Sequence, residues 1–152
     1  MNDQERRSGT APASIRVYRH PQDYQAVYDL WSRAGNGIHL RHSDEPEEIR
    51  KKTGRDPDLF LVAERDGKII GTVLGGFDGR RGMMYHLAVE PSERFRGIGE
   101  ALMAELEGRL REKGCIRYYL LVTRDNDEAI SFYERRGWKR MDDLYAYGKD
   151  LD

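Results

Sequence analysis

The sequence lacks the features that mark a secreted, disulfide-bonded or membrane-spanning protein. Cys115 is the only cysteine, so no internal disulfide can form, and a reducing compartment fits. No apolar run approaches the roughly 20 residues that a membrane-spanning helix needs. The polar start of the chain is not followed by the apolar segment of a secretory signal. We therefore predict a cytoplasmic protein without a membrane partner.

An excess of charge of one sign is lacking as well. The 152 residues carry a net charge of −1, although 35% of them are charged. This balance argues against broad nucleic-acid binding and leaves only a local basic patch open. The length and the 38% of hydrophobic residues suit one soluble domain with a real core. We expect that domain at 15–152, after a disordered polar tail at 1–14.

Alternating apolar residues and turn signals predict a mixed α/β fold. The expected strands are 15–19, 59–64, 68–77, 83–90 and 116–123. The last of them is nearly continuously apolar, so it should be covered on both faces. The Asp66-Gly67 pair predicts an antiparallel hairpin. The strand–helix–strand unit at 83–123 needs a crossover and should therefore be parallel.

Helical spacing and end signals predict the helices. One should open at His20-Pro21 and end at the glycines around Asn36, and a short one should span 46–52. Another should run from Ile98 to Gly114, and a last one should start at Asp125 and Glu128 and end at Gly137. A closing pair of strands is expected at 138–141 and 145–149. The paired glycines Gly75-Gly76 predict a bulge or a close approach by another group.

The stretch 85–106 combines a strand end, an Arg- and Gly-rich turn and a helix start. The turn contains Arg94, Arg96, Gly97 and Gly99. Glycine lets a backbone approach a ligand closely, and the amides at a helix start favour an anion. Arginine adds bidentate hydrogen bonds. These residues predict a cradle for a pyrophosphate group, and the alternative is a Gly-rich turn with solvated arginines.

Other phosphate-binding motifs fit this turn poorly. No Gly-Lys-Ser/Thr follows, and Leu102 stands where a dinucleotide fingerprint has its third glycine. The order of strand 87–91, Arg94-x-x-Gly97-x-Gly99 and amphipathic helix is instead similar to the Q/R-x-x-G-x-G/A signature of the GNAT superfamily. A later stretch resembles the family's other signature; it reads Asn126-x-x-Ala129-x-x-Phe132-Tyr133-x-x-x-Gly137-Trp138. The whole fold thus resembles a GNAT N-acetyltransferase, closest to small stand-alone bacterial members similar to ribosomal-protein N-terminal acetyltransferases.

The resemblance implies a centrally splayed mixed β-sheet flanked by helices, the GNAT fold. It implies acetyl-CoA as co-substrate, direct transfer of the acetyl group to a primary amine, and no metal. It leaves a homodimer open, because homodimers are frequent in the family. The residues that it places at coenzyme A are Leu87, Ala88, Val89, Arg94, Phe95, Arg96, Gly97, Ile98, Gly99, Glu100, Ala101, Asn126 and Tyr133.

The resemblance also assigns roles to the second signature. Tyr133 would be the general acid that protonates the CoA thiolate, and Asn126 would contact the pantetheine arm. The alternative for Tyr133 is that it is a core residue, and the alternative for Asn126 is that it only helps the helix start. The amide of Leu87 or Ala88 is the candidate donor to the oxyanion of the tetrahedral intermediate.

The sequence does not identify the residue that acts as general base. Many members carry a glutamate on the strand before the cradle, but here that strand has no carboxylate before Glu90. His86 is a candidate base because histidine titrates near neutral pH. Strict alternation places Tyr85 with Leu87 and Val89, and His86 on the opposite face, unless a bulge intervenes. The alternatives are a partly buried polar residue, a water-relayed base, or an amine that arrives neutral.

The sequence does not identify the amine acceptor. Acidic residues that would attract a cationic amine, or would simply form a solvated face, are Asp44, Glu45, Glu47, Glu48, Asp142 and Asp143. We interpret Cys115 as a small core residue without a catalytic role. The runner-up function is a catalytically weak acyl-CoA-binding module, such as a sensor or regulatory subunit, which would explain the missing carboxylate.

Overall fold

The structure is a computed structural model, which describes residues 11–35 and 38–152. The chain falls into two compact units, Met1–Leu121 and Val122–Asp152, and each is described by itself. Most of the predicted tail, residues 1–10, and the 36–37 part of the predicted helix end lie outside the described residues. No described helix has both the length and the apolar character that crossing a membrane requires.

The first unit is built on a five-stranded sheet in which the strands lie side by side in chain order. The strands are β1 (Ser14–Val17), β2 (Phe60–Arg65), β3 (Lys68–Phe77), β4 (Gly82–Val89) and β5 (Tyr118–Leu120). The first four form antiparallel neighbours, and β4 and β5 are parallel. The predicted antiparallel hairpin and parallel crossover are therefore confirmed.

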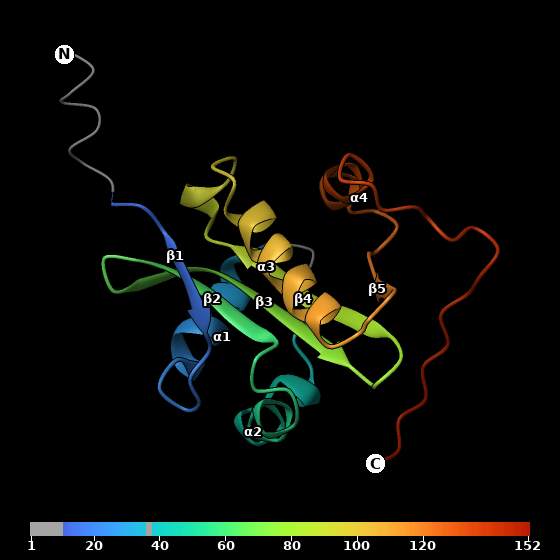
Figure 1. The fold of residues 1–152 in the computed structure, drawn as a ribbon, viewed down its shortest axis with the longest axis horizontal. Helices are drawn as coiled ribbons and strands as arrows, with labels where there is room; N and C mark the ends of the chain where they lie inside the picture. Colours follow the sequence, from blue (N-terminus) through green and yellow to red (C-terminus); the bar gives the residue numbers. More distant parts are fainter. Residues whose placement is uncertain (1–10, 36–37) are drawn as a thin grey trace. The chain divides into compact units, whose positions relative to one another are not determined.

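Helices cover both faces of this sheet. The helical elements are α1 (Tyr24–Arg33), η1 (His42–Asp44), α2 (Pro46–Arg55), η2 (Pro91–Glu93) and α3 (Ile98–Glu112). α3 crosses one face, in front of the strands in Figure 1. It packs so closely there that a Cβ atom on Gly75 would lie 2.5 Å from Leu106 Cδ1. The close approach predicted at Gly75-Gly76 is confirmed, and only glycine fits at Gly75.

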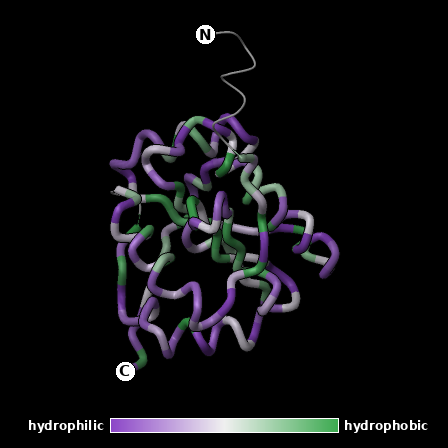
Figure 2. The backbone as a smooth tube through the Cα atoms, turned by 90° about the vertical axis from the view of Figure 1, so that its left-hand side faces the viewer, coloured by the Kyte–Doolittle hydropathy of each residue, from purple (hydrophilic) through white to green (hydrophobic). Residues whose placement is uncertain are grey.

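The opposite face carries α1 and α2 and holds an aromatic core. The ring of Trp31 stacks on Phe60 with centroids 6.1 Å apart, and Phe60 stacks on Tyr18 at 4.0 Å. Figure 2 shows hydrophobic stretches along the central strands and hydrophilic outer loops. Burying each large apolar side chain contributes about 1.5–3 kcal/mol. The members of this cluster are Tyr18, Val27, Leu30, Trp31, Ile49, Phe60, Val62, Ile69, Leu74 and Ala88.

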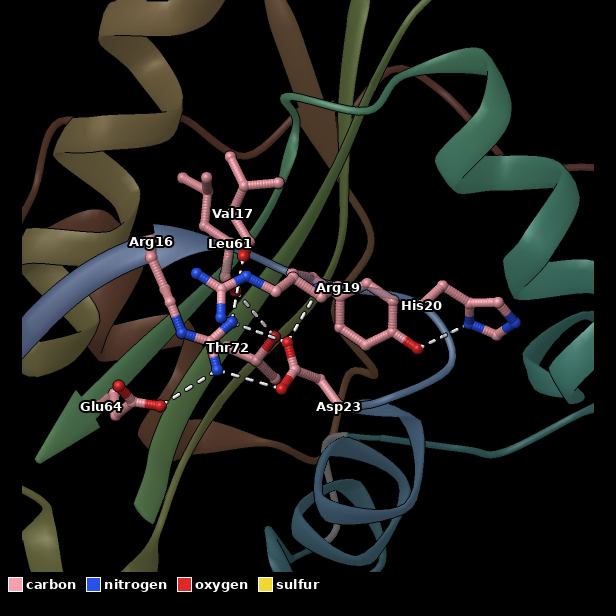
Figure 3. A network of polar contacts seen from close by, with 9 residues as sticks. Arg16, Val17, Arg19, His20, Asp23, Leu61, Glu64 and Thr72 are labelled. Carbon is pink, nitrogen blue, oxygen red and sulfur yellow. Dashed lines mark hydrogen bonds and ion pairs between the residues drawn. The ribbon is translucent and has the colours of Figure 1, made fainter. Parts of the chain in front are cut away.

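A polar network shown in Figure 3 ties β1 to α1 and β2. The Arg16 guanidinium donates to both carboxylate oxygens of Asp23, at 2.7 and 3.0 Å, and to Glu64 at 3.0 Å. Asp23 also accepts the backbone N–H of Arg19 at 2.7 Å. This carboxylate therefore closes a turn ahead of the helix, and α1 begins at Tyr24, later than the sequence predicted.

The expectation for the last strand of the first unit is wrong in two respects. β5 covers only Tyr118–Leu120, and its residues are half-buried. Ile116 and Leu121, which the sequence placed in a strand buried on both faces, are 94% and 71% exposed. The physical reason is that β5 lies at the sheet edge and pairs with β4 over three residues only.

The second unit contains one helix, α4 (Asp127–Glu134). Asn126 caps its start, so the expected capping by Asp125 and Glu128 is wrong. The predicted closing pair of strands at 138–141 and 145–149 is also wrong, because no strand is formed there. Tyr145 and Tyr147 are 78% and 93% exposed. An isolated hairpin that buries no apolar face is marginal in water.

Candidate active site

The edge of β4 that faces β5 is open along most of its length. β4 pairs with β3 from Gly82 to Val89, but with β5 only from Gly82 to Met84. In the described part of the chain, no strand pairs with this edge from Tyr85 to Val89. An extended, amide-rich ligand can add to such an edge through main-chain hydrogen bonds. Leu87, half-buried, lies at the middle of the open segment.

A bulge stands at the beginning of this open edge. The pairing of β3 with β4 shifts between Leu74 with His86 and Gly75 with Met84, so Tyr85 is the extra residue. Leu74 belongs to the core on the α1–α2 face, whereas Gly75 faces α3. Because cross-strand partners share a face, His86 lies on the α1–α2 face and Met84 on the other.

The bulge also places the Tyr85 ring on the α1–α2 face. A Cβ atom on Gly76 would lie 3.1 Å from both Lys52 Nζ of α2 and Tyr85 Cε2. The bulge that the sequence analysis left open is therefore present, and Tyr85 and His86 lie on the same face, not on the opposite faces that strict alternation would give. The extra residue changes the phase of the strand, which side-chain alternation alone cannot reveal.

His86 is held between α1 and η1. Its Nε2 lies 2.8 Å from Oδ1 of Asp44, and its ring packs edge-on against Trp31 with centroids 5.0 Å apart. The side chain of His86 is 17% exposed. Nδ1 has no hydrogen-bond partner among the described residues, and it is not one of their buried unpartnered atoms. Asp44 thus occupies Nε2, and Nδ1 is the ring nitrogen left for a ligand.

Asp44 is buried, with 4% of its surface exposed. Its Oδ2 accepts the backbone N–H of Arg41 at 3.0 Å, and its carbonyl accepts the hydroxyl of Tyr24 at 2.8 Å. Burial by itself would raise the pKa of Asp44. The hydrogen bonds from His86 and Arg41 and their charges outweigh burial, and the pKa lies below its ordinary value. Asp44 is therefore an anion at neutral pH.

The acidic cluster predicted around Asp44 does not form one open anionic surface. Asp44 points inward, and its neighbours pair with nearby bases. Glu47 bonds Arg50 at 2.6 Å, and Glu48 lies 2.8 Å from Lys51. These pairs leave little net charge to attract a cationic amine.

The turn after β4 has the backbone geometry of a cradle. Gly97 adopts a left-handed conformation, φ 83°, and is the N-cap of α3, where no side chain makes a cap hydrogen bond. The first-turn N–H groups of a helix have no intrahelical acceptor. Phe95 also has a positive φ, 64°, and its side chain is 97% exposed. These residues present backbone donors and an aromatic ring outward.

The arginines of the turn make intramolecular contacts. Arg94 donates to the carbonyl of Ala34, the C-cap of α1, at 2.5 Å. Arg96 is half-exposed and lies 3.4 Å from Glu93. Glu93 in turn bonds Arg65 of β2, which lowers the pKa of its carboxyl. Arg94 therefore fastens the turn to α1, whereas Arg96 stays at the surface.

In the second unit the residues of the other signature lie on α4. Asn126 Oδ1 accepts the N–H of Ala129 at 3.1 Å, so this side chain caps the helix. The Tyr133 ring makes edge contacts with Phe132 and Trp138, with centroids at 5.2 and 5.8 Å. Burial raises the pKa of Tyr133 to about 12, so its hydroxyl is protonated at neutral pH.

The structure thus brings together the predicted residues of β4, the turn and the start of α3 within one unit. Asn126 and Tyr133 belong to the other unit and stay predictions as parts of the same site. Sequence reasoning missed the contact of Asp44 with His86, which lies 42 positions later. No local signal reveals such a pair. The described residues also contain no cluster of three or more His, Cys, Asp or Glu side chains that could hold a metal ion.

Known proteins resemble this chain in sequence. The Acetyltransferase (GNAT) family matches residues 24–138. An acetyltransferase of Sodalis glossinidius is 44% identical over 138 residues, which cover 90% of this chain and 94% of the relative.

Solved structures give the same fold. Ard1 from Thermoplasma volcanium superposes with a TM-score of 0.73 and 26% identity, covering 84% of this chain and 82% of that one. The PaiA N-acetyltransferase from Thermoplasma acidophilum, solved with coenzyme A, gives 0.72 and 21%, covering 85% and 91%.

Proposed function

This chain belongs to the GNAT family of acetyltransferases, and from this premise we propose that it transfers the acetyl group of acetyl-CoA to a primary amine. One observation supports the proposal: the open edge of β4 and the start of α3 belong to one unit and follow each other along the chain. The open edge of β4 leads directly into the turn that ends at the uncapped start of α3. An extended ligand with an anionic end matches that path.

Each part of coenzyme A has a proposed partner along this path. The amides from Arg96 to Ala101, with the Arg96 side chain, bind the pyrophosphate. The backbone groups of Leu87 and Val89 pair with the amides of the pantetheine arm. Phe95 and Asn126 complete the contacts. Arg94 acts by holding the turn against Ala34, as its 2.5 Å hydrogen bond indicates.

Acetyl transfer needs three groups: a hydrogen-bond donor to the oxyanion, an acid for the leaving thiolate and a base for the attacking amine. The amide of Leu87, which points to the open edge because Glu90 and hence Ala88 direct their N–H groups to β3, donates to the oxyanion of the tetrahedral intermediate. Tyr133, protonated at neutral pH, donates to the leaving thiolate. His86 accepts the proton of the attacking amine through Nδ1, the ring nitrogen that Asp44 does not occupy. In balance, one proton passes from nitrogen to sulfur as the C–N bond forms and the C–S bond breaks, and proton exchange with water returns His86 and Tyr133 to their starting forms.

The acid assignment is tested by Tyr133→Phe. We expect kcat to fall by about 10²-fold or more while the Kd for CoA changes little, because only a transition-state contact is removed. Thiol release from acetyl-CoA is measured with the best substrate from a panel of peptides, polyamines, aminoglycosides and small amines. Phe132→Leu is the matched control, since it changes the neighbouring ring without touching the hydroxyl. An unchanged kcat in Tyr133→Phe would remove the assigned role.

The second candidate is the acyl-CoA-binding module. It is favoured by one observation: β4 carries no carboxylate, and its following Glu90 is taken by Arg33 at 2.7 Å. The same panel separates the two functions. Thermal stabilisation by CoA together with no thiol release on any amine would favour the module over the enzyme.

A further inference from the structure

The pair formed by Asp44 and His86 is more buried and has more hydrogen bonds than a surface ion pair. Asp44 Oδ1 lies 2.8 Å from His86 Nε2, and Oδ2 is occupied by the backbone N–H of Arg41. Both carboxylate oxygens thus have donors, so the side chain cannot rotate without losing one. Such a fixed acceptor selects the tautomer of its histidine.

The pair also lies at the point where β4 and β5 separate. Pairing between these strands ends at Met84, the bulge is at Tyr85, and His86 follows at once. The open edge begins there, so a ligand lying along β4 from the α3 turn would end beside His86. Trp31 covers the ring from the α1 side. Nδ1 is the ring nitrogen that has no hydrogen-bond partner among the described residues.

We propose that Asp44 is a positioning residue that accepts the Nε2–H of His86 and so keeps Nδ1 as the atom that takes the acceptor amine's proton. This inference rests on the proposed acetyl transfer. In the step, the amine nitrogen bonds to the acetyl carbon, and the electron pair of the C–S bond leaves with sulfur. The nitrogen's proton goes to His86 Nδ1, and Tyr133 supplies one to the thiolate. Asp44 itself touches neither substrate.

The alternative role for Asp44 is purely structural, because it also fastens η1 to β4 and receives the Tyr24 hydroxyl. The two roles differ in what they predict for the folded enzyme. If Asp44 is only structural, its substitution changes the melting temperature and leaves turnover per folded molecule intact. If Asp44 is a positioning residue, its substitution changes turnover through His86 and through no other group.

The first measurement needs no active-site variant of Asp44. Long-range ¹H–¹⁵N spectra of the ligand-free wild type at pH 8 report the tautomer of each of the four histidines. The His86 signals are assigned by their loss in His86→Gln. We expect the proton on Nε2 and an unprotonated Nδ1. A proton on Nδ1 would overturn the inference, whatever the enzyme's activity.

The second measurement is a double-mutant cycle in thiol release. We expect Asp44→Asn to lower kcat by about 10- to 100-fold with little change in the Kd for CoA, and His86→Gln to lower it at least as far. Added to His86→Gln, Asp44→Asn should cost less than about 2-fold more. Asp29→Asn, an exposed aspartate of α1 bonded to Gln25, is the matched control.

The outcomes separate this inference from the proposed function. A wild type that binds CoA but acetylates no amine overturns acetyl transfer, and the inference with it. A wild type with turnover and an Asp44→Asn variant of unchanged kcat overturns the positioning role alone. Equal losses from Asp44→Asn with and without His86 would also overturn it, because Asp44 would then act independently.

Discussion

Two aspartates are buried among the described residues of the first unit, and their partners differ in one chemical respect. Asp23 is 8% exposed and holds the guanidinium of Arg16 through two hydrogen bonds. Asp44 is 4% exposed and holds the imidazole of His86 through one. Asp23 is the N-cap of α1, and Asp44 is the last residue of η1. A guanidinium keeps its proton at all physiological pH values, whereas an imidazole exchanges its proton near neutrality.

This difference distinguishes a pair that only joins parts of the fold from a pair with a proposed role in proton transfer. The hydrogen bond from Arg16 holds the pKa of Asp23 below its ordinary value, and Asp23 in turn raises the pKa of Arg16. Neither group titrates near neutral pH, so the pair can only join β1 to α1. Asp23 thus has a structural role, whereas the role that we propose for Asp44 lies in proton transfer through His86.

The largest expected effect comes from breaking the structural pair. Asp23→Ala should lower the free energy of unfolding by about 3 kcal/mol, since it removes the carboxylate that holds the partly buried Arg16 through two hydrogen bonds and leaves only the Glu64 carboxylate and the Val17 carbonyl. Urea denaturation at pH 7 measures the change. Asp29→Ala, on the exposed side of the same helix, should stay within about 0.5 kcal/mol of the wild type. A loss below about 1 kcal/mol for Asp23→Ala would contradict the assigned role.

The next effect contrasts the two aspartates in turnover. Asp23→Asn should leave the kcat of the folded enzyme within about 2-fold, while Asp44→Asn lowers it by about 10-fold or more. The reason is that only Asp44 contacts a proposed proton acceptor. Thiol release is normalised to the folded fraction from circular dichroism. Equal losses of kcat in both variants would show that Asp44 has no role in turnover beyond that of Asp23.

A smaller effect is expected in the pH dependence of stability. The folded-state pKa of Asp23 is lowered, so its contribution is present above the ordinary aspartate range and is lost as pH falls through the folded value. The stability difference between wild type and Asp23→Asn should be constant from pH 8 to about 5. Below about pH 4 it should shrink by on the order of 1 to 2 kcal/mol. Denaturation curves across this range measure it, and a difference that grows on acidification would refute the sign.

The smallest effect is expected at the outer end of the Arg16 network. Glu64 is 30% exposed at its side chain, and Asp23 still pairs with Arg16 when Glu64 is changed. Glu64→Gln should therefore cost only about 0.5 kcal/mol, and less at high salt. Urea denaturation at low and at molar salt gives both values. A cost comparable to that of Asp23→Ala would mean that the two carboxylates share the role equally.

The local pattern of the sequence determined much of this protein. Apolar periodicity and the Asp66-Gly67 turn predicted the meander from β2 to β4, and the Arg/Gly turn before Ile98 indicated the family. These features depend on residues close together in the chain, where propensity and spacing act directly. The strand predictions failed on either side of β5 and at 138–149, where apolar residues suggested strands that no partner completes, although the last predicted helix did form as α4.

Tertiary structure alone decided which side chains meet at the open edge of β4. The bulge at Tyr85 depends on how β4 pairs with β3, and it moved Tyr85 onto the face of His86. The hydrogen bond from His86 to Asp44 joins residues 42 positions apart. Pairing register and long-range contacts arise from packing the whole sheet against its helices, and no short window of sequence contains that information.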